Sequence, residues 1–350
     1  METIKIGLIG CGRVSPLHVE GYQKTKGAKI VALCAPRLQK AYDLAEKYSL
    51  DNVEYFADYR DVLSHQGLVD AVDIMTPDYL HAEITKDCSK AGLHILCEKP
   101  LAINSKDAQE MYDDIRQARI IAMVGLVYRF NPAVLTIKRL IDNGSIGDIY
   151  HFRARLSTPR LSNPELPLEW RLDRSKGGYG AVSDLGSHFI DLARFLTDDE
   201  FASVMGMGQI FIHDRHKPDR DEFDEVTAYD AASISGKMRK GTMINIEVSR
   251  FAAGGSTFEV DGSKASVRYA NDDIYIWRKE VIDHQKPSTE FVPLDVGQFE
   301  SYETSLYSNF IRCIQTDTQG KPDFYDGLVC QQILDNIDES INRGHIIKIN

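Results

Sequence analysis

The sequence predicts an α/β protein with two domains: a doubly wound parallel sheet, then an α+β domain with a large, mostly antiparallel sheet. Its 350 residues suggest two domains at about 150 residues each. In the first third, short apolar runs alternate with amphipathic stretches of helical period, which is typical of a parallel sheet with crossover helices. Beyond Asn131-Pro132 the pattern changes to successive strands. We therefore expect domains at 1–126 and 127–350.

In the first domain, the apolar runs predict strands at 4–9, 30–34, 71–75, 94–97 and 120–127. Apolar residues at three- and four-residue steps predict helices at 38–48, 79–91 and 105–118. These helices are the expected crossovers between parallel strands.

In the second domain, a helix up to residue 142 precedes a strand at 149–156, and a proline-rich irregular loop follows at 158–176. Loops of this length are more often functional than idle. Further strands are expected at 228–235, 241–250, 256–261 and 266–269, with a turn at 236–240. Helices at 302–315 and 327–342 are expected to pack on this sheet, and 346–349 to return as a terminal strand.

The net charge of −11, from 41 basic and 52 acidic residues, disfavours binding to nucleic acid or to anionic membranes. The most apolar stretch, 120–127, is far shorter than the roughly 20 residues that cross a bilayer. Six cysteines are widely spaced without a C-x-x-C pair, which favours reduced thiols and argues against a zinc site. We expect a soluble, cytoplasmic protein.

A glycine turn follows the first strand directly. Gly10 permits a tight turn, and Gly12 lets the backbone approach a pyrophosphate at the start of the next helix. Ser15 stands where a third glycine or alanine is usual, and it is small enough to keep helix and strand close. The pattern predicts a dinucleotide-binding, Rossmann-type domain at 1–126, and the alternative is a purely structural turn.

The end of the second strand bears on the choice of cofactor. It reads Cys34-Ala35-Pro36-Arg37 and lacks the carboxylate that usually binds the ribose hydroxyls of NAD. Arg37 is a suitable partner for a 2′-phosphate, so we favour NADP over NAD. Arg13 is an alternative partner for that phosphate.

Three segments carry a family resemblance: Thr76-Pro77-Asp78-Tyr79-Leu80-His81, Glu98-Lys99-Pro100 within 91–102, and the glycine-rich lead at 177–191 into Asp184-x-x-x-His188. Together with the glycine turn they resemble the Gfo/Idh/MocA family of nicotinamide-dependent sugar and polyol oxidoreductases. Segments 167–171, 247–251 and 258–264 are similar to members acting on levoglucosan and related pyranose sugars.

The resemblance implies a catalytic set of Lys99, Asp184 and His188, with Glu98 near the nicotinamide ribose and a cis bond before Pro100. It also suggests a homodimer or homotetramer formed through the second domain. The expected cofactor contacts are Gly10, Gly12, Arg13, Val14, Ala35, Arg37, Thr76, Pro77, His81, Glu98 and Lys99. The expected substrate contacts are Tyr128, Arg129, Asn131, Trp170, Arg171, Asp184, His188 and, beside them, Arg250.

The residue types fit this chemistry independently. Hydride transfer from a carbinol carbon leaves a hydroxyl proton, which calls for a base such as His188 with a pKa near neutrality. Asp184 and His188 are four residues apart and would share one face of a helix. Lys99 ends a parallel strand, where open α/β folds bind ligands, and its ammonium can stabilise an alkoxide.

Each residue also has a structural alternative: a helix cap, a core polar group or interdomain packing. For the whole chain, the alternatives are a dinucleotide-binding sensor without turnover and a reductase of an imine or a double bond. His18 and His81 are expected at the cofactor edge without a catalytic role. Tyr179 stands where the family usually has glycine. The acidic run at 219–225 is expected to be a solvated loop, and no metal is assigned.

Overall fold

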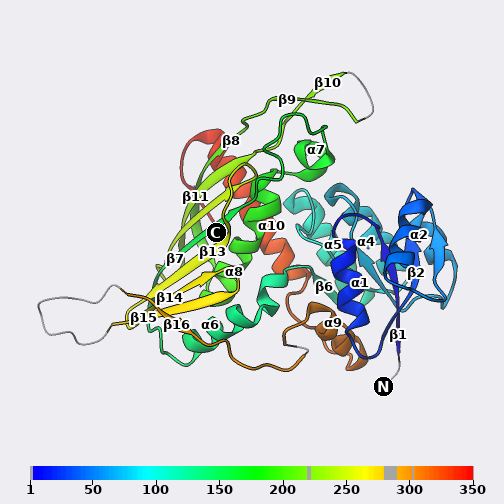
Figure 1. Cartoon of the computed structure of the whole chain (residues 1–350), viewed down its shortest axis with the longest axis horizontal. Coiled ribbons are helices and arrows are strands. Elements are labelled where there is room, and N and C mark those ends of the chain that lie inside the picture. The colour runs from blue at the N-terminus through cyan, green and yellow to red at the C-terminus, as the bar shows by residue number, and fades with distance from the viewer. Residues whose placement is uncertain (1–2, 219–221, 280–289, 302, 350) are drawn as a thin grey trace, which may run out of the picture. The chain divides into compact units, whose positions relative to one another are not determined.

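The computed structural model describes residues 3–218, 222–279, 290–301 and 303–349, and its chain divides into two compact units (Figure 1). The first unit comprises Met1–Val127 and Glu300–Gln331, and the second comprises Tyr128–Phe299 and Gln332–Asn350. The domain limits 1–126 and 127–350 stay a prediction about parts that fold independently. The structure adds that residues 300–331 pack with the first unit.

The first unit is built on a six-stranded sheet in the order β3-β2-β1-β4-β5-β6. These strands are β1 (Ile4–Ile9), β2 (Ala28–Cys34), β3 (Glu54–Phe56), β4 (Ala71–Ile74), β5 (His94–Cys97) and β6 (Ala122–Val124). All neighbours are parallel, so their carboxyl ends meet at one edge. The strand order reverses between β1 and β4, which is where open α/β sheets bind ligands. The predicted Rossmann-type sheet is confirmed.

The helices of this unit are α1 (Ser15–Gln23), α2 (Leu38–Lys47), α3 (Tyr59–Ser64), α4 (His81–Lys90), α5 (Ser105–Ala118) and α9 (Leu306–Gln315). The sequence analysis missed β3 and α3, which are too short to give a periodic signal. Strand β6 is also shorter than predicted, because a 3₁₀ turn, η2 (Val127–Phe130), follows it closely.

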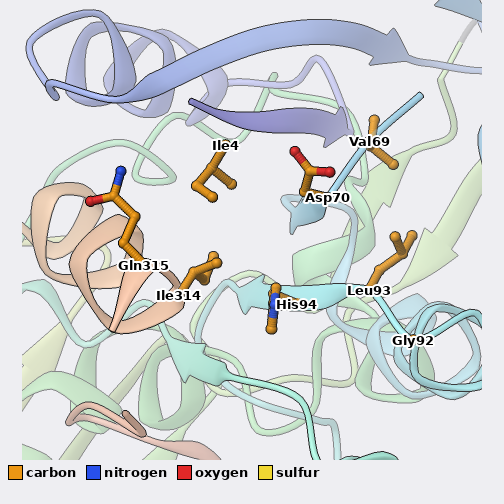
Figure 2. A pocket seen from close by; sticks show the side chains of 8 residues that line it. All are labelled: Ile4, Val69, Asp70, Gly92, Leu93, His94, Ile314 and Gln315. Carbon is orange, nitrogen blue, oxygen red and sulfur yellow. The ribbon is translucent and has the colours of Figure 1, made fainter. Parts of the chain in front are cut away.

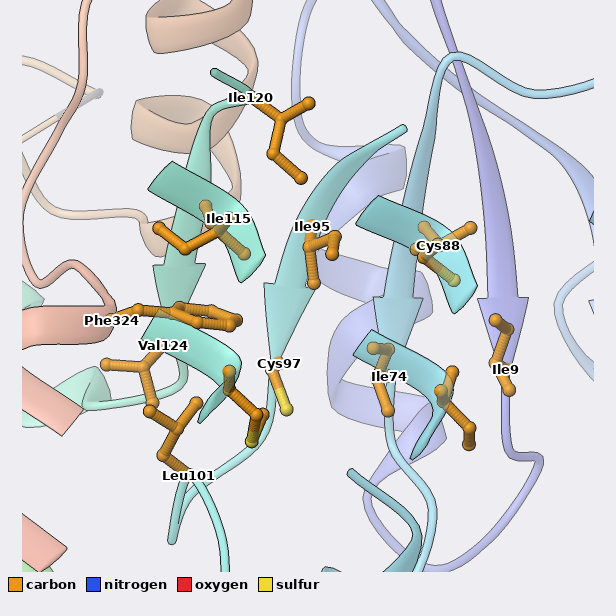
Figure 3. Close-up of a cluster of buried hydrophobic side chains, with 14 of the residues drawn as sticks. Ile9, Ile74, Cys88, Ile95, Cys97, Leu101, Ile115, Ile120, Val124 and Phe324 are labelled. Atoms are coloured by element: carbon orange, nitrogen blue, oxygen red, sulfur yellow. The ribbon is translucent and has the colours of Figure 1, made fainter. Parts of the chain in front are cut away.

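The core of the first unit joins the strands to helices α4 and α5 (Figure 3). Ile74 and Ile95 come from β4 and β5, and Ile115 comes from α5. Phe324, the first residue of α10 (Phe324–Arg343), is fully buried in the same cluster. A side chain at least 200 positions away from the strands therefore completes their core.

The expectation that the late helices pack on the antiparallel sheet is wrong for α9 and correct for the second part of α10, where Ile341 packs against Gly206 of β8 and the Gly206 amide donates to Ser340 Oγ at 3.1 Å. Helix α9 packs on α1, where the ring centroids of Tyr22 and Tyr307 lie 5.0 Å apart. The first part of α10, up to Gln331, also belongs to the first unit. Periodicity identifies an amphipathic helix but does not say which apolar surface will cover it.

Within residues 300–331, which we call the returning segment, Gln319 and Pro322 form hydrogen bonds with the edge strand β6. The Gln319 side chain accepts from the Ala122 amide at 3.2 Å and donates to the Ala122 carbonyl at 2.8 Å. The Val124 amide donates to the Pro322 carbonyl at 3.1 Å. An open strand edge invites pairing with other chains, and here the returning segment occupies it.

The second unit contains a nine-stranded sheet in the order β16-β15-β14-β13-β7-β12-β11-β8-β17. The strands are β7 (Ile149–Ser157), β8 (Phe201–Gln209), β11 (Ala231–Met238), β12 (Met243–Ser249), β13 (Gly255–Gly262), β14 (Ala265–Ala270), β15 (Asp273–Arg278), β16 (Val292–Leu294) and β17 (Ile347–Lys348). Among the described pairs, β7 and β12 run parallel and the others antiparallel. The predicted mostly antiparallel sheet is confirmed.

Helices α6 (Pro132–Asp142) and α8 (Ser187–Thr197) pack on this sheet. Phe189 of α8 meets Phe152 of β7 and Phe258 of β13 at centroid distances of 6.4 and 6.3 Å. These three buried rings form an aromatic core, in which rings contribute beyond the area they bury.

The sequence analysis missed β8, β15 and β16, and it ended β11 too early. Residues 236–238, expected in a turn, continue β11, because Gly236 and Lys237 pair with both β8 and β12. Strand β8 contains Gly206 and Gly208, and a Cβ at either position would lie within 3.0 Å of Ile341 or Tyr229. Close packing explains glycines that read as strand breakers in the sequence.

Replacing Phe324 with Ala should destabilise the first unit by about 3–5 kcal/mol, because a buried ring leaves a cavity among β-strand side chains. The measurement is the free energy of unfolding by urea denaturation. The control is Tyr325→Ala on the same helix, where the ring is 45% exposed and a much smaller loss is expected. Equal losses in the two variants would contradict the placement of Phe324 in this core.

Candidate functional site

The glycine turn closes tightly over the end of β4. Gly10 has φ +107°, and a Cβ there would lie 2.7 Å from the carbonyl oxygen of Met75. Any other residue would be strained in backbone and blocked in space. Gly12 is exposed, and none of the described atoms lies within 4 Å of its Cβ position. The backbone at Gly12 is therefore open to a ligand.

Helix α1 begins where the turn ends, and no side chain caps its start. Val14 is the N-cap residue and makes no side-chain capping bond. The buried Ser15 hydroxyl donates instead to the Gly12 carbonyl at 2.7 Å. The Ser15 and Leu17 amides donate to the Gly12 and Val14 carbonyls at 3.3 and 3.0 Å, and Pro16 has no N–H. The positive end of the helix dipole still favours an anion at this place, in accord with a pyrophosphate. Ser15 thus replaces the usual small residue and braces the turn.

The two arginines predicted to bind a 2′-phosphate, Arg13 and Arg37, are exposed. Ala35 is buried, and its amide donates to the Phe56 carbonyl at 3.0 Å. Arg37 is exposed at the N-cap of α2, and Arg13 is exposed in the glycine turn. Both arginines stay candidates for a 2′-phosphate.

Beyond β4, Thr76 and Pro77 lead into η1 (Asp78–Leu80) and α4. The Thr76 hydroxyl is buried and has no hydrogen-bond partner among the residues that the structure describes. Buried polar atoms are normally satisfied, so this hydroxyl and the open Gly12 fit a bound dinucleotide along the carboxyl edge.

His81 ties two segments of that edge together. Its Nε2 lies 3.1 Å from the Thr76 carbonyl, and its Nδ1 lies 3.0 Å from the Pro100 carbonyl. The ring is fully buried, and burial lowers its pKa. A neutral imidazole can donate a hydrogen bond to only one of these two carbonyls, and burial between Thr76 and Pro100 holds the ring in place. The expectation that His81 is not catalytic stays a prediction.

Glu98, Lys99 and Pro100 directly follow β5, at the same edge as the glycine turn. The Lys99–Pro100 bond is cis, as the resemblance suggests. The Lys99 amide donates to Glu98 Oε2 at 3.2 Å. A Cβ on Gly125 would lie only 2.7 Å from Glu98 Oε1, so this glycine makes room for the carboxylate.

The Glu98 carboxylate is one end of a buried ionic network that we call the His18 network: Asp73, His18 and Glu98. His18 Nδ1 lies 2.7 Å from Asp73 Oδ2, and Nε2 lies 3.1 Å from Glu98 Oε1. The His18 and Asp73 side chains are 3% and 0% exposed, and that of Glu98 is 14% exposed. The sequence analysis placed His18 at the cofactor edge but missed Asp73.

The charge of the His18 network follows from its two hydrogen bonds. Burial alone lowers the pKa of His18 and raises that of Asp73, but the two carboxylates outweigh it and raise the pKa of His18 to about 10. A neutral imidazole could donate to only one carboxylate. Tyr22 and Tyr307 lie beside the network. Burial, and to a smaller extent the charge of Asp73, raise the pKa values of both hydroxyls, so these hydroxyls stay neutral.

In the second unit, Asp184 lies in a π-helical turn, η4 (Val182–Gly186), and His188 lies in the first turn of α8. The four-residue spacing predicts that both side chains share one face of a regular helix. The structure differs, because Asp184 lies in the π-helical turn and His188 in the α-helix that follows it. Such π turns are frequent at functional sites. Gly180, at φ +65°, precedes η4, and a Cβ there would lie 2.4 Å from the Tyr229 carbonyl oxygen.

Arginines surround the Asp184 carboxylate. Arg250 is 1% exposed and donates to Asp184 Oδ2 at 3.2 Å and to the Arg171 carbonyl at 3.1 Å. Arg171 Nε lies 4.0 Å from the same carboxylate oxygen. Burial lowers the pKa of Arg250, although arginine still keeps its proton. Asp184 is thereby held as an oriented carboxylate.

Three of the predicted substrate contacts, Tyr128, Arg129 and Asn131, form contacts with other side chains of the protein. Tyr128 packs edge-on against His188, with centroids 5.1 Å apart, and donates to Ser256 Oγ at 2.8 Å. Arg129 makes a two-bond pair with Asp191, and Asn131 caps α6 and donates to Asp272. The sugar-binding role of these residues stays a prediction.

Trp170 and Arg171 stand in η3 (Trp170–Leu172), where the Arg171 guanidinium lies 4.0 Å from the Trp170 ring. The preceding loop is fixed by the fully buried Arg215, which donates to the Leu161 carbonyl at 2.6 Å and to two further carbonyls. The sequence analysis missed Arg215. Tyr179 is buried and donates to Asp335 at 2.9 Å.

In the acidic run 219–225, residues 219–221 lie outside the described part of the chain. Phe223–Glu225 form strand β10, which pairs with β9 (Asp214–His216), instead of the expected loop. No group of three or more metal-binding side chains occurs among the described residues. No helix in the described part has the length and apolarity to cross a membrane. All six cysteines are free.

A hollow of about 530 Å³ lies at the opposite, amino edge of the parallel sheet (Figure 2). Ile4, Asp70 and His94 line it at the starts of their strands, and Ile314 and Gln315 contribute from α9. The His94 Nδ1 accepts from the Ile121 amide at 3.0 Å. None of the predicted site residues lines this hollow.

Comparison with known proteins matches both parts of the chain. A model described as an oxidoreductase family with an NAD-binding Rossmann fold matches residues 4–126. A model of the GFO/IDH/MocA C-terminal domain matches residues 134–268.

Individual relatives cover most of the chain. Levoglucosan dehydrogenase of Pseudarthrobacter phenanthrenivorans is 30% identical over 292 residues, which cover 76% of this chain and 73% of that protein. Inositol 2-dehydrogenase of Rhizobium meliloti is 27% identical over 358 residues and 99% of each chain. A structure of levoglucosan dehydrogenase in complex with NADH and levoglucosan has a TM-score of 0.90 at 26% identity and covers 100% of both chains.

His18 should remain a cation at neutral pH and titrate near pH 10, far above the ordinary histidine value. Because the folded pKa exceeds the unfolded one, the stability it contributes is complete below about pH 6.5 and is lost as the pH rises through 10. The measurement is the ring ¹⁵N shift of His18 by NMR from pH 5 to 10. Asp73→Asn should lower the midpoint, and a wild-type midpoint near 6.5 would contradict the ionic network.

Proposed function

Because the chain belongs to the Gfo/Idh/MocA family of oxidoreductases, we propose that it is an NAD(P)-dependent dehydrogenase or reductase. It transfers a hydride between the nicotinamide and a carbinol carbon of a cyclic sugar, polyol or sugar derivative. The observation that carries the proposal is one shared edge: the open glycine turn, the partnerless Thr76 hydroxyl and Lys99 all follow carboxyl ends of strands β1, β4 and β5.

The chemistry divides among three side chains. In the oxidation direction the nicotinamide supplies the hydride acceptor. His188 takes the hydroxyl proton as general base, so the carbinol becomes a carbonyl. The Lys99 ammonium stabilises the developing alkoxide. Asp184, fixed by Arg250 at 3.2 Å, orients the reacting hydroxyl. The proposal requires all three side chains to act on one substrate molecule.

The substrate class rests on the relatives and on residue types in the second unit. The named relatives act on levoglucosan, inositol and glucose 6-phosphate, all of which are cyclic polyols. In this chain, Tyr128 and Trp170 supply aromatic faces, and Arg171 lies beside Asp184. Aromatic faces with a few oriented polar groups suit a sugar ring.

For the cofactor, we propose NADP in preference to NAD. Strand β2 runs into buried Ala35 and exposed Arg37, with no carboxylate at its end. A carboxylate there would repel a 2′-phosphate, whereas a guanidinium pairs with it through two hydrogen bonds. The matching family model describes NAD binding and does not mention NADP. The proposed preference for NADP therefore rests on Arg37.

We further propose a homodimer or homotetramer in the cytoplasm, without nucleic-acid or membrane partners. Met205, Met207 and Met243 are 41%, 70% and 50% exposed on strands β8 and β12 of the large sheet. Exposed apolar side chains gathered on one sheet face favour self-association.

Lys99→Ala should lower turnover by about a hundredfold or more, because the alkoxide loses its electrostatic partner, while cofactor affinity survives. The measurement is steady-state reduction of NADP⁺ and NAD⁺ over a panel of sugars and polyols, with cofactor titration by fluorescence. Lys106→Ala, whose side chain is 84% exposed, is the matched control. Full activity of Lys99→Ala would overturn the catalytic assignment, and firm cofactor binding without turnover on any substrate would favour the sensor.

Arg37→Ala should weaken NADPH binding about tenfold, the worth of a charge-assisted hydrogen bond, and leave NADH binding unchanged. Isothermal titration of both cofactors measures the difference. Arg13→Ala serves as the comparison. If only Arg13→Ala lowers NADPH affinity, the phosphate contact belongs to the glycine turn, and equal NADPH affinity in all three proteins would contradict the proposed preference.

A further inference from the structure

Strands β9 and β10 pair with each other outside the large sheet and form what we call the arm (Figure 1). Arg215 is the middle residue of β9, and its side chain is fully buried. Its Nη1 donates to the Asn163 and Leu166 carbonyls at 2.8 and 3.1 Å, and its Nη2 donates to the Leu161 carbonyl at 2.6 Å. All three carbonyls belong to the proline-rich loop 158–176. One guanidinium thus joins the arm to this loop.

The loop depends on such a donor because its own backbone is irregular. Residues 158–169, all within the described part of the chain, form neither helix nor strand. Backbone carbonyls removed from water need donors, and a guanidinium presents several donors in a fixed fork. Arg215 therefore does for this loop what a neighbouring strand does in a sheet. The arm adds a backbone bond, since the Leu168 amide donates to the His216 carbonyl at 2.7 Å.

The segment of the loop that Arg215 holds also contacts the arginine that orients Asp184. The Leu161 amide donates to the Arg250 carbonyl at 3.3 Å. Arg250 in turn donates to the Arg171 carbonyl at 3.1 Å and to Asp184 Oδ2 at 3.2 Å. A continuous series of hydrogen-bonded residues therefore runs from Arg215 to the Asp184 carboxylate.

Apolar packing connects the arm to the other end of the loop. Leu161 and Leu172 are buried in one cluster with Val226, which directly follows β10. The Thr227 amide donates to the Leu172 carbonyl at 3.0 Å. Leu172 is the last residue of η3, the turn that begins at Trp170. The arm thus fixes the loop both before η3 and at its end.

We propose that Arg215 is a positioning residue for the substrate, because it holds the loop that carries Trp170 and Arg171. Through Arg250, the same hold extends to the Asp184 carboxylate. The inference rests on the proposed function and extends its substrate site to the arm. All the residues assigned to the cofactor belong to the first unit, whereas Arg215 belongs to the second. Arg215 should therefore matter for the sugar or polyol and not for the cofactor.

The kinetic test compares Arg215→Met with Arg215→Lys in the full chain. Met keeps a long side chain but donates no hydrogen bond, whereas Lys keeps a cation with three donors. On a substrate that wild type turns over, Arg215→Met should raise the KM of the sugar or polyol about tenfold, as expected for lost charge-assisted hydrogen bonds. The dissociation constant of the cofactor should not change. Arg215→Lys should lie between wild type and Arg215→Met.

The matched control is Arg239→Met, which removes an exposed arginine from the turn between β11 and β12. It should alter neither constant. A double variant, Arg215→Met with Arg171→Ala, tests the route of the effect. Its KM should be no higher than that of the weaker-binding single variant, because residues that act through one contact are not additive.

A second measurement needs no substrate. Trp170 and Trp277 are the two tryptophans of the sequence, so in a Trp277→Phe background the fluorescence comes from Trp170. Arg215→Met should free the loop and raise the quenching of Trp170 by acrylamide. Arg239→Met should leave the quenching as it is in the background.

Several results would overturn the inference. Unchanged substrate KM or unchanged Trp170 quenching in Arg215→Met would remove the role. Equal losses for substrate and cofactor would assign Arg215 to stability alone, and additive losses with Arg171→Ala would separate it from the loop. A Lys variant no better than the Met variant would assign the loss to packing instead of donors.

If Arg215→Met does not fold, Arg215→Lys is judged against wild type by the same criteria. A wild type that binds the cofactor but turns over no sugar or polyol would refute the proposed function, and the role of Arg215 in substrate recognition with it. Raised quenching in that case would still show that the failure lies in the proposed function and not in the hold of Arg215 on the loop.

Discussion

The cost of removing charge from water governs how both site regions are built. A carboxylate can be kept ionised and motionless away from solvent only if cations or several donors hold it. In the first unit, the His18 imidazole meets this need for Asp73 and Glu98. In the second unit, the buried Arg250 meets it for Asp184. In both units, a buried cation fixes a carboxylate that the proposed reaction needs in one orientation, and the surrounding strands and turns supply the frame.

The parallel sheet could be predicted from the sequence because its strands are buried on both faces and read as short apolar runs. The bounds of β1, β5 and α5 agree with the predicted 4–9, 94–97 and 105–118. Strand β3 and helix α3 were not predicted, because Glu54–Phe56 and Tyr59–Ser64 mix polar and apolar residues over too few positions to show an apolar run or a helical period. The packing of α9 and of the first part of α10 on the first unit was not predictable either, since their apolar faces match more than one surface. Strand β8 was not predicted because Gly206 and Gly208 are unusual within a strand. In the structure they leave room for the side chains of Ile341 and Tyr229.

For the candidate site, motifs located residues but not their partners. The glycine turn, Glu98-Lys99-Pro100 and the Asp184-x-x-x-His188 element all appear in the sequence, whereas Asp73 is one carboxylate in an apolar run and Arg215 one cation in a polar segment. A lone charge inside an apolar strand is a usable signal, because burying it without a partner is expensive. Its partner came from α1, which no local pattern could reveal. The π turn at Asp184 was likewise invisible, since its sequence reads as ordinary helix.

The return of residues 300–331 to the first unit has a consequence for biosynthesis. As the polypeptide leaves the ribosome, Phe324 and the residues that occupy the edge of β6 emerge about 200 residues after that strand. Until then the first unit lacks the Phe324 ring in its core, and the edge of strand β6 has no backbone partner from residues 319–323. An autonomous fragment ending after β6 would keep both defects permanently, so the first unit can mature only after the strands of the second unit that precede residue 300 have been made.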